Sequence, residues 1–404
     1  MSSAGRSLCV GFRFVLSMIA MWTSAAPPLA LAQSPRIEFL GTAVVPGTSL
    51  DRSGLAGDVE TGVPVAILGG FSGIEYSGDG DRFLLLTDRG PADGANTYPC
   101  RVHEFDLPIP ESATQLSTPR LVATHLLRDE AGRTLSGRAT LFSTNASGES
   151  LRFDPEAVRR SAQGGWWISD EYGPSISQFD ASGRRLRTLP IPAKYFVDFP
   201  SADRIEENDR NKSGRRSNGG FEALAATTSP DRLWAMVQRP LLQDSVRRED
   251  GTYVGRNCRL LEYDLESKES REFVYQLDNE GNGVNELLPY SDSQFLTIER
   301  DDVPGPLAKC KRIMLCDVEQ ATDVRDLSRL AGDLPATVRP VRKEVFLDLL
   351  DPCWKLAGES FPEKIEGLAW GKRLSDGRQL LVVTSDNDCD PLEPSRIWFF
   401  AVQR

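Results

Sequence analysis

The sequence predicts an all-β fold: a β-propeller of five or six blades, each a sheet of four antiparallel strands. One pattern, which starts with an acidic residue and ends in a strongly apolar strand, recurs five times at a spacing of about 65 to 80 residues. Further strand-like runs follow each copy, and helical periodicity is weak beyond the first 32 residues. Four strands per unit at this spacing are typical of propeller blades.

The first 32 residues have the composition of a secretory signal peptide. Two arginines precede a short apolar run at 14–22, and the small residues 30–32 suit a cleavage site. The run is too short to span a bilayer, although an N-terminal anchor is the alternative. We expect residues 1–32 to be removed and 33–404 to form one exported domain, periplasmic or extracellular, without membrane attachment.

The charge of the chain argues against a nucleic-acid partner. Removal of residues 1–32 takes away two positive charges, so that the net charge changes from -11 to -13. A nucleic-acid binder needs a basic surface that displaces counterions. An acidic surface is compatible with an exported protein that binds cations.

Six cysteines follow the predicted cleavage site, and an even number in an oxidising compartment predicts disulfide bonds. They are Cys100, Cys258, Cys310, Cys316, Cys353 and Cys389. No CxxC pair is present, and the only two histidines, His103 and His125, fall in predicted outer strands. We therefore expect no zinc site, and packing or surface roles for the histidines.

The strands of each copy are predicted in a fixed order. The acidic starts lie in 71–75, 153–157, 220–224, 284–287 and 365–369. The apolar strands with charged ends follow at 83–90, 166–173, 233–240, 295–302 and 380–388. Two outer strands then follow at 101–107 and 121–127, 175–180 and 184–189, 259–265 and 272–277, and 311–318 and 343–349.

The fifth copy has only one further strand, at 397–402. The run 36–45 is predicted to supply its outer strand, which would close the ring by pairing the N- and C-terminal strands and leave no exposed edge. A sixth, degenerate blade could lie in 127–152 or 190–217.

The polar stretch 201–218 is predicted as a long loop before the third copy. It is either a solvated insertion or a mobile flap that carries Lys212, Arg215 and Arg216 over the site.

The propeller topology predicts that the charged residues meet. The first strand of a blade lines the central channel and the second runs antiparallel to it, so the start of the first and the end of the second share one rim. The predicted clusters are Glu75 with Asp88 and Arg89; Asp154 and Glu156 with Asp170 and Glu171; Glu222 with Gln238 and Arg239; Glu286 with Glu299, Arg300 and Asp301; and Glu366 with Asp386, Asn387 and Asp388.

Carboxylates crowded at one mouth raise each other's pKa or need a counter-charge. Oxygen ligands without histidine or cysteine suit Ca²⁺ best, with Mg²⁺ or Mn²⁺ next. The predicted metal ligands are Glu75, Asp88, Asp154, Glu156, Asp170, Glu171, Glu299, Asp301, Glu366, Asp386 and Asp388. The alternative for each residue is a structural role, in which it caps a turn or accepts backbone N–H groups.

Several of these segments resemble the phytase-like domain described as "esterase-like activity of phytase". The resemblance is carried by 69–91 (GGFSGIEYSGDGDRFLLLTDRGP), 153–183 and 218–225, and continues through 285–302 and 364–370. It implies an exported β-propeller related to the calcium-dependent phytases and a phosphate-ester substrate. One departure is that those phytases carry several lysines near the phosphate, where this chain has Arg89, Arg239 and Arg300.

The leading hypothesis is therefore a monomeric, metal-dependent hydrolase of small-molecule phosphate esters. Arg89, Arg239 and Arg300 would bind the substrate, and Glu222 or Glu286 would serve as general base. The alternatives are a non-catalytic exported propeller that binds a ligand or protein partner through its rim, and a propeller lactonase or other metal-dependent esterase. Convergence of carboxylates from at least three blades would favour the metal-dependent hypotheses.

Overall fold

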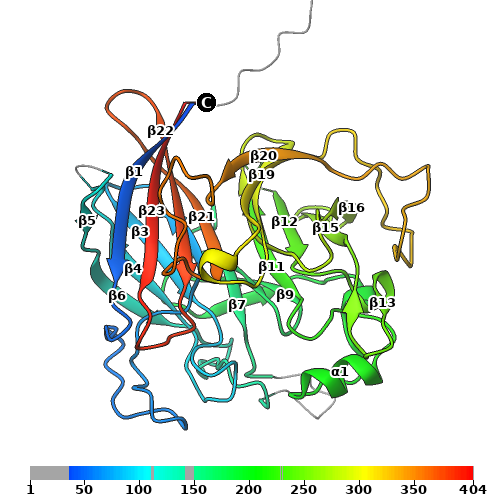
Figure 1. The fold of residues 1–404 in the computed structure, drawn as a ribbon. Coiled ribbons are helices and arrows are strands. Elements are labelled where there is room, and N and C mark those ends of the chain that lie inside the picture. The colour runs from blue at the N-terminus through cyan, green and yellow to red at the C-terminus, as the bar shows by residue number, and fades with distance from the viewer. Residues whose placement is uncertain (1–35, 111–112, 142–149, 228, 230, 404) are drawn as a thin grey trace, which may run out of the picture. The chain divides into compact units, whose positions relative to one another are not determined.

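The computed structural model describes residues 36–110, 113–141, 150–227, 229 and 231–403. The residues from 36 onward form five antiparallel sheets arranged as a five-bladed β-propeller (Figure 1). The predicted all-β propeller is thereby confirmed with five blades. The predicted signal peptide lies outside the described residues, so its boundary stays a prediction.

Each blade has four main strands, which follow one another from the channel outward. Blade 1 contains β2 (Phe71–Tyr76), β3 (Arg82–Thr87), β4 (Arg101–Asp106) and β6 (Arg120–Leu126). Blade 2 contains β7 (Pro155–Arg160), β8 (Trp166–Asp170), β9 (Ser175–Phe179) and β10 (Arg185–Thr188). Blade 3 contains β11 (Phe221–Ala226), β12 (Arg232–Val237), β15 (Asn257–Asp264) and β16 (Ser270–Gln276).

Blade 4 contains β17 (Gly283–Pro289), β18 (Gln294–Arg300), β19 (Lys311–Asp317) and β20 (Arg342–Asp348). Blade 5 contains β21 (Lys364–Arg373), β22 (Gln379–Asp386), β23 (Ser395–Gln403) and β1 (Arg36–Val45). Shorter elements are β5 (Leu116–Ser117), β13 (Val246–Arg247), β14 (Tyr253–Val254), α1 (Arg204–Arg210) and the 3₁₀ turns η1 (Ala193–Tyr195), η2 (Leu242–Asp244) and η3 (Gly305–Leu307).

The two ends of the described chain close the ring as the sequence predicts. Strand β1 pairs antiparallel with β23 from Arg36 opposite Gln403 to Val45 opposite Ser395. In Figure 1 the blue β1 lies beside the red β23. No sixth blade forms, because the described residues of 127–152 and 190–217 contain no further sheet.

The stretch 201–218 is not a plain loop, since it contains the short helix α1. Asp203 begins this helix by accepting the backbone N–H groups of Ile205 and Glu206. Arg215 is buried and donates to Glu207 at 2.6 Å, which ties the segment down. The prediction of a mobile flap that carries Arg215 over the site is therefore wrong for this residue, because its side chain is buried in the protein.

The five inner strands pack side by side around the channel, in the order β2, β7, β11, β17, β21 and back to β2. Each pairs with the second strand of its blade through a register irregularity near its start. We call these five positions the inner-strand bulges. Because a bulge inserts a residue and re-aims side chains, it determines which ones face the mouth of the channel.

The predicted disulfide bonds are absent from the structure, in which all six cysteines beyond the predicted cleavage site are free thiols. Cys310 and Cys316 are six residues apart along one extended segment, about 20 Å, whereas a disulfide needs Cα atoms within roughly 7 Å. Cys353 is exposed, and the other five thiols are buried. That prediction was therefore wrong.

Candidate functional site

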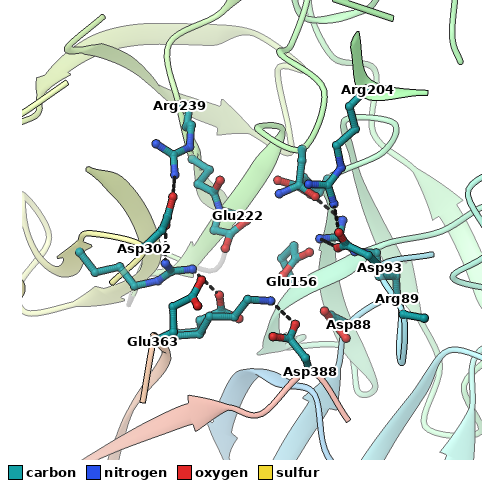
Figure 2. A pocket seen from close by; sticks show the side chains of 17 residues that line it. Asp88, Arg89, Asp93, Glu156, Arg204, Glu222, Arg239, Asp302, Glu363 and Asp388 are labelled. Atoms are coloured by element: carbon teal, nitrogen blue, oxygen red, sulfur yellow. Dashed lines mark hydrogen bonds and ion pairs between the residues drawn. The ribbon is translucent and has the colours of Figure 1, made fainter. Parts of the chain in front are cut away.

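A cavity of about 420 Å³ opens at the mouth of the central channel (Figure 2). Nine carboxylates line it: Asp88, Asp93, Glu156, Glu171, Glu222, Asp302, Glu363, Glu366 and Asp388. Five cationic side chains line it as well: Arg89, Arg204, Arg239, Arg300 and Lys364. The excess of carboxylates favours a bound cation, while the arginines offer contacts to an anion.

Three inner-strand bulges bring their glutamates to one point. Glu156 of blade 2, Glu222 of blade 3 and Glu366 of blade 5 each place a carboxylate oxygen within 4.8 Å of the others. We call these residues the central trio. The register shifts at Glu222 and Glu366 leave each glutamate without a partner on the neighbouring strand.

The central trio is buried and under-neutralised. Burial, followed by the negative charge of neighbouring carboxylates, holds the pKa values of Glu156 and Glu222 well above the ordinary range. Arg300 donates to Glu366 at 2.7 Å, but one buried oxygen of Glu222, Oε2, has no hydrogen-bond partner. A buried carboxylate with an unsatisfied oxygen is costly, so a cation or a proton is needed there.

Asn285 of blade 4 contacts two members of the central trio, and the sequence-based prediction did not include it. Its Nδ2 donates to Glu222 Oε1 and, at 3.3 Å, to Glu366 Oε1. Its Oδ1 is buried and has no partner. The sequence pattern pointed to the neighbouring Glu286, which aligns with the other acidic starts, yet the amide beside it is the group that contacts Glu222 and Glu366.

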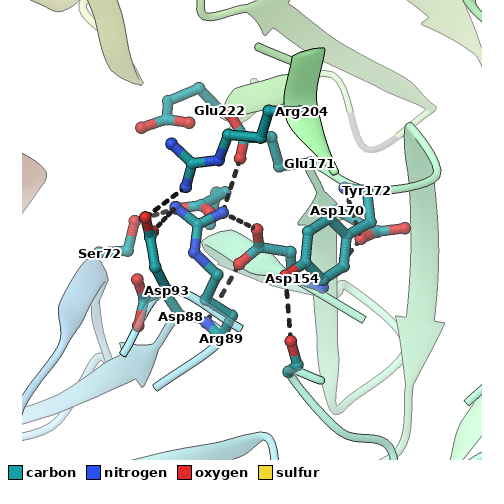
Figure 3. A network of polar contacts seen from close by, with 12 residues as sticks. Ser72, Asp88, Arg89, Asp93, Asp154, Asp170, Glu171, Tyr172, Arg204 and Glu222 are labelled. Atoms are coloured by element: carbon teal, nitrogen blue, oxygen red, sulfur yellow. Dashed lines mark hydrogen bonds and ion pairs between the residues drawn. The ribbon is translucent and has the colours of Figure 1, made fainter. Parts of the chain in front are cut away.

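A second carboxylate group flanks the trio on the blade 2 side. Asp154, Glu156 and Glu171 offer oxygens within 4.8 Å of one another, and Arg89 donates to Asp154 at 2.5 Å and to Glu171 at 3.2 Å (Figure 3). Burial raises the pKa of Glu171 to about 7, although Arg89 opposes the rise. Glu171 Oε1 is also buried without a partner.

A third group lies between blades 1 and 5, where Asp88, Asp386 and Asp388 offer oxygens within 4.8 Å of one another. Lys364 contacts Asp386 at 3.1 Å and also pairs with Asp388. Burial raises the pKa of Asp386 to about 7, with Lys364 lowering it in opposition. Lys364 thus supplies part of the counter-charge that this group needs.

Glu75 is one of the predicted site residues that do not line the cavity. Glu75 pairs with Leu84 near the start of β3, whereas Asp88 follows its end, so the two lie at opposite ends of the hairpin. Ser72 holds the bulge position of blade 1 instead, and it donates to Glu156. The prediction erred by three residues along the strand.

Glu286 is another predicted site residue that does not line the cavity. Its backbone has φ 53° at the blade 4 bulge, and its carboxylate pairs with Arg159 at 2.5 Å instead of lining the cavity. Arg159 also lies 3.6 Å from Glu75 and donates to the carbonyl oxygens of Ile74 and Leu287. Glu75, Arg159 and Glu286 therefore form a network that links inner strands apart from the mouth.

Three other predicted ligands have structural contacts. Asp170 accepts the backbone N–H groups of Asp154, Tyr172 and Gly173. Glu299 accepts from Tyr275 at 2.7 Å and pairs with Lys343, and Asp301 pairs with Lys311 at 3.0 Å. None of the three lines the cavity, which matches the structural alternative for each of them.

The donor set fits a calcium ion. The central trio and Asn285 offer only carboxylate and amide oxygens, without histidine or cysteine. Unpartnered buried oxygens on Glu222 and Asn285 are positions from which a cation could be bound. Hard oxygen ligands of this kind prefer Ca²⁺ over softer transition metals.

The family model described as "Phytase-like: Esterase-like activity of phytase" matches residues 66–389. An "Uncharacterized secreted protein" of Arthroderma benhamiae is 27% identical over 225 residues, which cover 47% of this chain and 43% of that protein. The match therefore spans less than half of that relative. None of the helices in the described part of the chain has the length and hydropathy that a bilayer-spanning segment needs.

Solved structures with some similarity include two exo-β-1,3-galactanases. The enzyme from Phanerochaete chrysosporium is 8% identical, with a TM-score of 0.43 over 89% of this chain and 64% of that one. The enzyme from Clostridium thermocellum is 10% identical, with a TM-score of 0.40 over 87% and 62%. Similarity at this level carries no information about activity.

Proposed function

This chain belongs to the phytase-like family whose description is "Esterase-like activity of phytase". We propose that it is an exported hydrolase of small-molecule phosphate esters. Its activity would depend on a divalent cation, calcium by preference. The observation that carries the proposal is the central trio. Carboxylates from three blades gather within 4.8 Å, beside arginines that suit a phosphoryl group.

The central trio and Asn285 would hold the cation. When bound, a divalent cation supplies positive charge that polarises a phosphoryl group and lowers the pKa of water. Lys364 partly neutralises Asp386 and Arg300 partly neutralises Glu366, so that an anionic substrate would be repelled less from the mouth.

Side chains of the protein itself would bind the substrate and accept a proton. Arg89, Arg239 and Arg300 all line the cavity, and their guanidinium groups would donate hydrogen bonds to phosphoryl oxygens. Of the two predicted bases, only Glu222 lines the cavity. Glu171 is a further carboxylate able to accept a proton near neutral pH, since its pKa is raised to about 7 and one oxygen has no partner.

Hydrolysis assays test this proposal directly. The mature protein would be incubated with p-nitrophenyl phosphate, bis-p-nitrophenyl phosphate or phytate, each with Ca²⁺ or with EDTA. We expect turnover with Ca²⁺ on at least one substrate, its loss in EDTA, and its return on adding excess Ca²⁺. Absence of turnover on all three in Ca²⁺ would contradict the proposal and favour a binding propeller.

Export is part of the same proposal. It is supported by the predicted signal peptide and by the name of the fungal relative, which describes a secreted protein. Mass spectrometry of the protein recovered outside the cytoplasm should find Gln33 as the first residue. Retention of residues 1–32 in the recovered protein would contradict it.

A further inference from the structure

Two pairs of arginines line the cavity, and each pair is bridged by one aspartate. The bridging residues Asp93 and Asp302 lie on opposite sides of Glu156 and Glu222 (Figure 2). Asp93 contacts Arg89 at 3.1 Å through one oxygen and Arg204 at 2.6 Å through the other. Asp302 does the same between Arg239, at 2.5 Å, and Arg300, at 2.7 Å. Each aspartate therefore occupies the position between two guanidinium groups that an oxyanion would take.

The inner arginine of each pair is held in place from behind. Arg89 uses Nη1 for the buried Asp154 and Glu171, and Nη2 for Asp93 (Figure 3). Arg300 uses Nη2 for the buried Glu366 and Nη1 for Asp302. Both guanidinium groups would keep their orientation if the aspartate in front moved away, because the buried contacts remain.

The bridging aspartates are exposed, unlike the carboxylates behind the arginines. The Asp93 side chain is 59% exposed and that of Asp302 is 48% exposed. Exposed ion pairs are weak, so either side chain can leave for solvent at small cost. Ala92 and Asp93 both have φ 58°, a backbone conformation that needs a local reason, and the contact of Asp93 with two arginines is one.

We propose that Asp93 and Asp302 are internal counter-anions: they fill two arginine pairs at the mouth and are displaced when oxyanion groups of a ligand enter. The ligand class is one that carries a phosphoryl group or a similar tetrahedral oxyanion. The inference rests on the proposed function only for the identity of that anion. Arg204 and Arg239 would then bind the anion together with Arg89 and Arg300, which buried carboxylates hold in place.

Direct binding of inorganic phosphate to the mature protein tests this inference. Asp93→Asn and Asp302→Asn keep the shape of the side chain but remove the competing charge. We expect each variant to bind phosphate roughly threefold more tightly by isothermal titration calorimetry at fixed Ca²⁺, the scale of an exposed ion pair. The double variant should show the same roughly threefold gain at both arginine pairs, because the two bridges share no partner and act independently.

Asp209→Asn is the matched control. Asp209 pairs with Arg247 at 2.5 Å with a side chain 43% exposed, but neither residue lines the cavity. Its phosphate affinity should equal that of the unaltered protein. Unchanged or weaker binding in both cavity variants, or no phosphate binding by any form, would overturn the inference. Tighter binding without any hydrolysis would overturn the proposed activity alone, so the two failures are distinguishable.

Discussion

Glu222 combines three properties at the scale of a single residue. It occupies an inner-strand bulge, it is buried, and its Oε2 has no hydrogen-bond partner. Its other oxygen accepts from Asn285, which fixes the side chain in place. A buried carboxylate oxygen without a partner destabilises the folded protein. Because the side chain is already oriented, this oxygen is well placed to bind a cation, which would remove that cost.

Replacing Glu222 by Gln should therefore weaken calcium binding by at least about tenfold, since the site loses one charged ligand. Isothermal titration calorimetry of the mature protein with CaCl₂ measures the change. The matched variant is Glu286→Gln, the same substitution at the corresponding position of blade 4, where the carboxylate pairs with Arg159 away from the mouth. Glu286→Gln should keep the calcium affinity. Equal losses in both variants would contradict the assignment.

The same two glutamates show what the sequence could and could not predict. The repeat pattern marked both as acidic starts of inner strands, and in the structure both lie at inner-strand bulges. The pattern gave no sign that Glu286 has φ 53° and that Asn285 contacts Glu222 in its place. A change of one residue in register reverses which side chain faces a given side of a strand, and repeat spacing does not resolve it.

At the scale of elements, small residues beside the bulges let neighbouring inner strands approach. A Cβ on Gly73 would lie 2.8 Å from the carbonyl oxygen of Glu156 and 3.1 Å from the Cα of Ala157. Both contacts are with backbone of the next blade, so they cannot be relieved by a side-chain rotation. The bulge that aims Glu156 is thus packed directly against β2.

Gly73→Ala should lower the free energy of unfolding by about 1–3 kcal/mol, the usual cost of overpacking. Urea unfolding followed by tryptophan fluorescence measures the change, and calcium affinity should fall with it because the Glu156 backbone shifts. Gly281→Ala is the control, since its Cβ would meet only the Asn279 side chain at 3.4 Å. A Gly73→Ala protein as stable as the control would contradict this packing.

The elements themselves were the most predictable part of the fold. Apolar alternation located the outer strands to within about two residues, and the closing strand was predicted at 36–45, as observed for β1. Helix α1 was missed because it is short and polar, and it depends on the Asp203 cap and the Glu207–Arg215 ion pair rather than on an apolar face.

At the scale of the whole molecule, closing the ring concentrates carboxylates from distant parts of the chain. Glu156, Glu222 and Glu366 are separated by more than 60 residues from one another in sequence, yet share one cavity. The folded protein therefore holds protons that the unfolded chain would release. The pKa values of Glu171 and Asp386 are raised to about 7 from 4.5 and 3.8, mainly by burial.

These raised pKa values predict how stability depends on pH. Between the ordinary carboxyl pKa and about 7 the folded state binds more protons than the unfolded state, so in EDTA the free energy of unfolding should fall as pH rises through this window. Each of the two groups should contribute a fall of about 2.5 kcal/mol between about pH 5 and about pH 8, so the total should be on the order of 5 kcal/mol.

Urea titrations at both pH values, with EDTA or with Ca²⁺, measure this dependence. Calcium should reduce the fall, because a bound cation replaces the protons of the mouth carboxylates as counter-charge. It should not abolish the fall, because burial also raises the pKa of Glu286, away from the mouth, to about 7. Stability that rises with pH in EDTA would mean that the mouth carboxylates are already neutralised by their arginine and lysine neighbours.

Anomalous X-ray diffraction from crystals of the mature protein grown with CaCl₂ tests directly whether the central trio binds a calcium ion. We expect an anomalous peak at the mouth of the channel, within about 2.5 Å of carboxylate oxygens of Glu156, Glu222 and Glu366. A map at saturating calcium with no peak between these three side chains would contradict it.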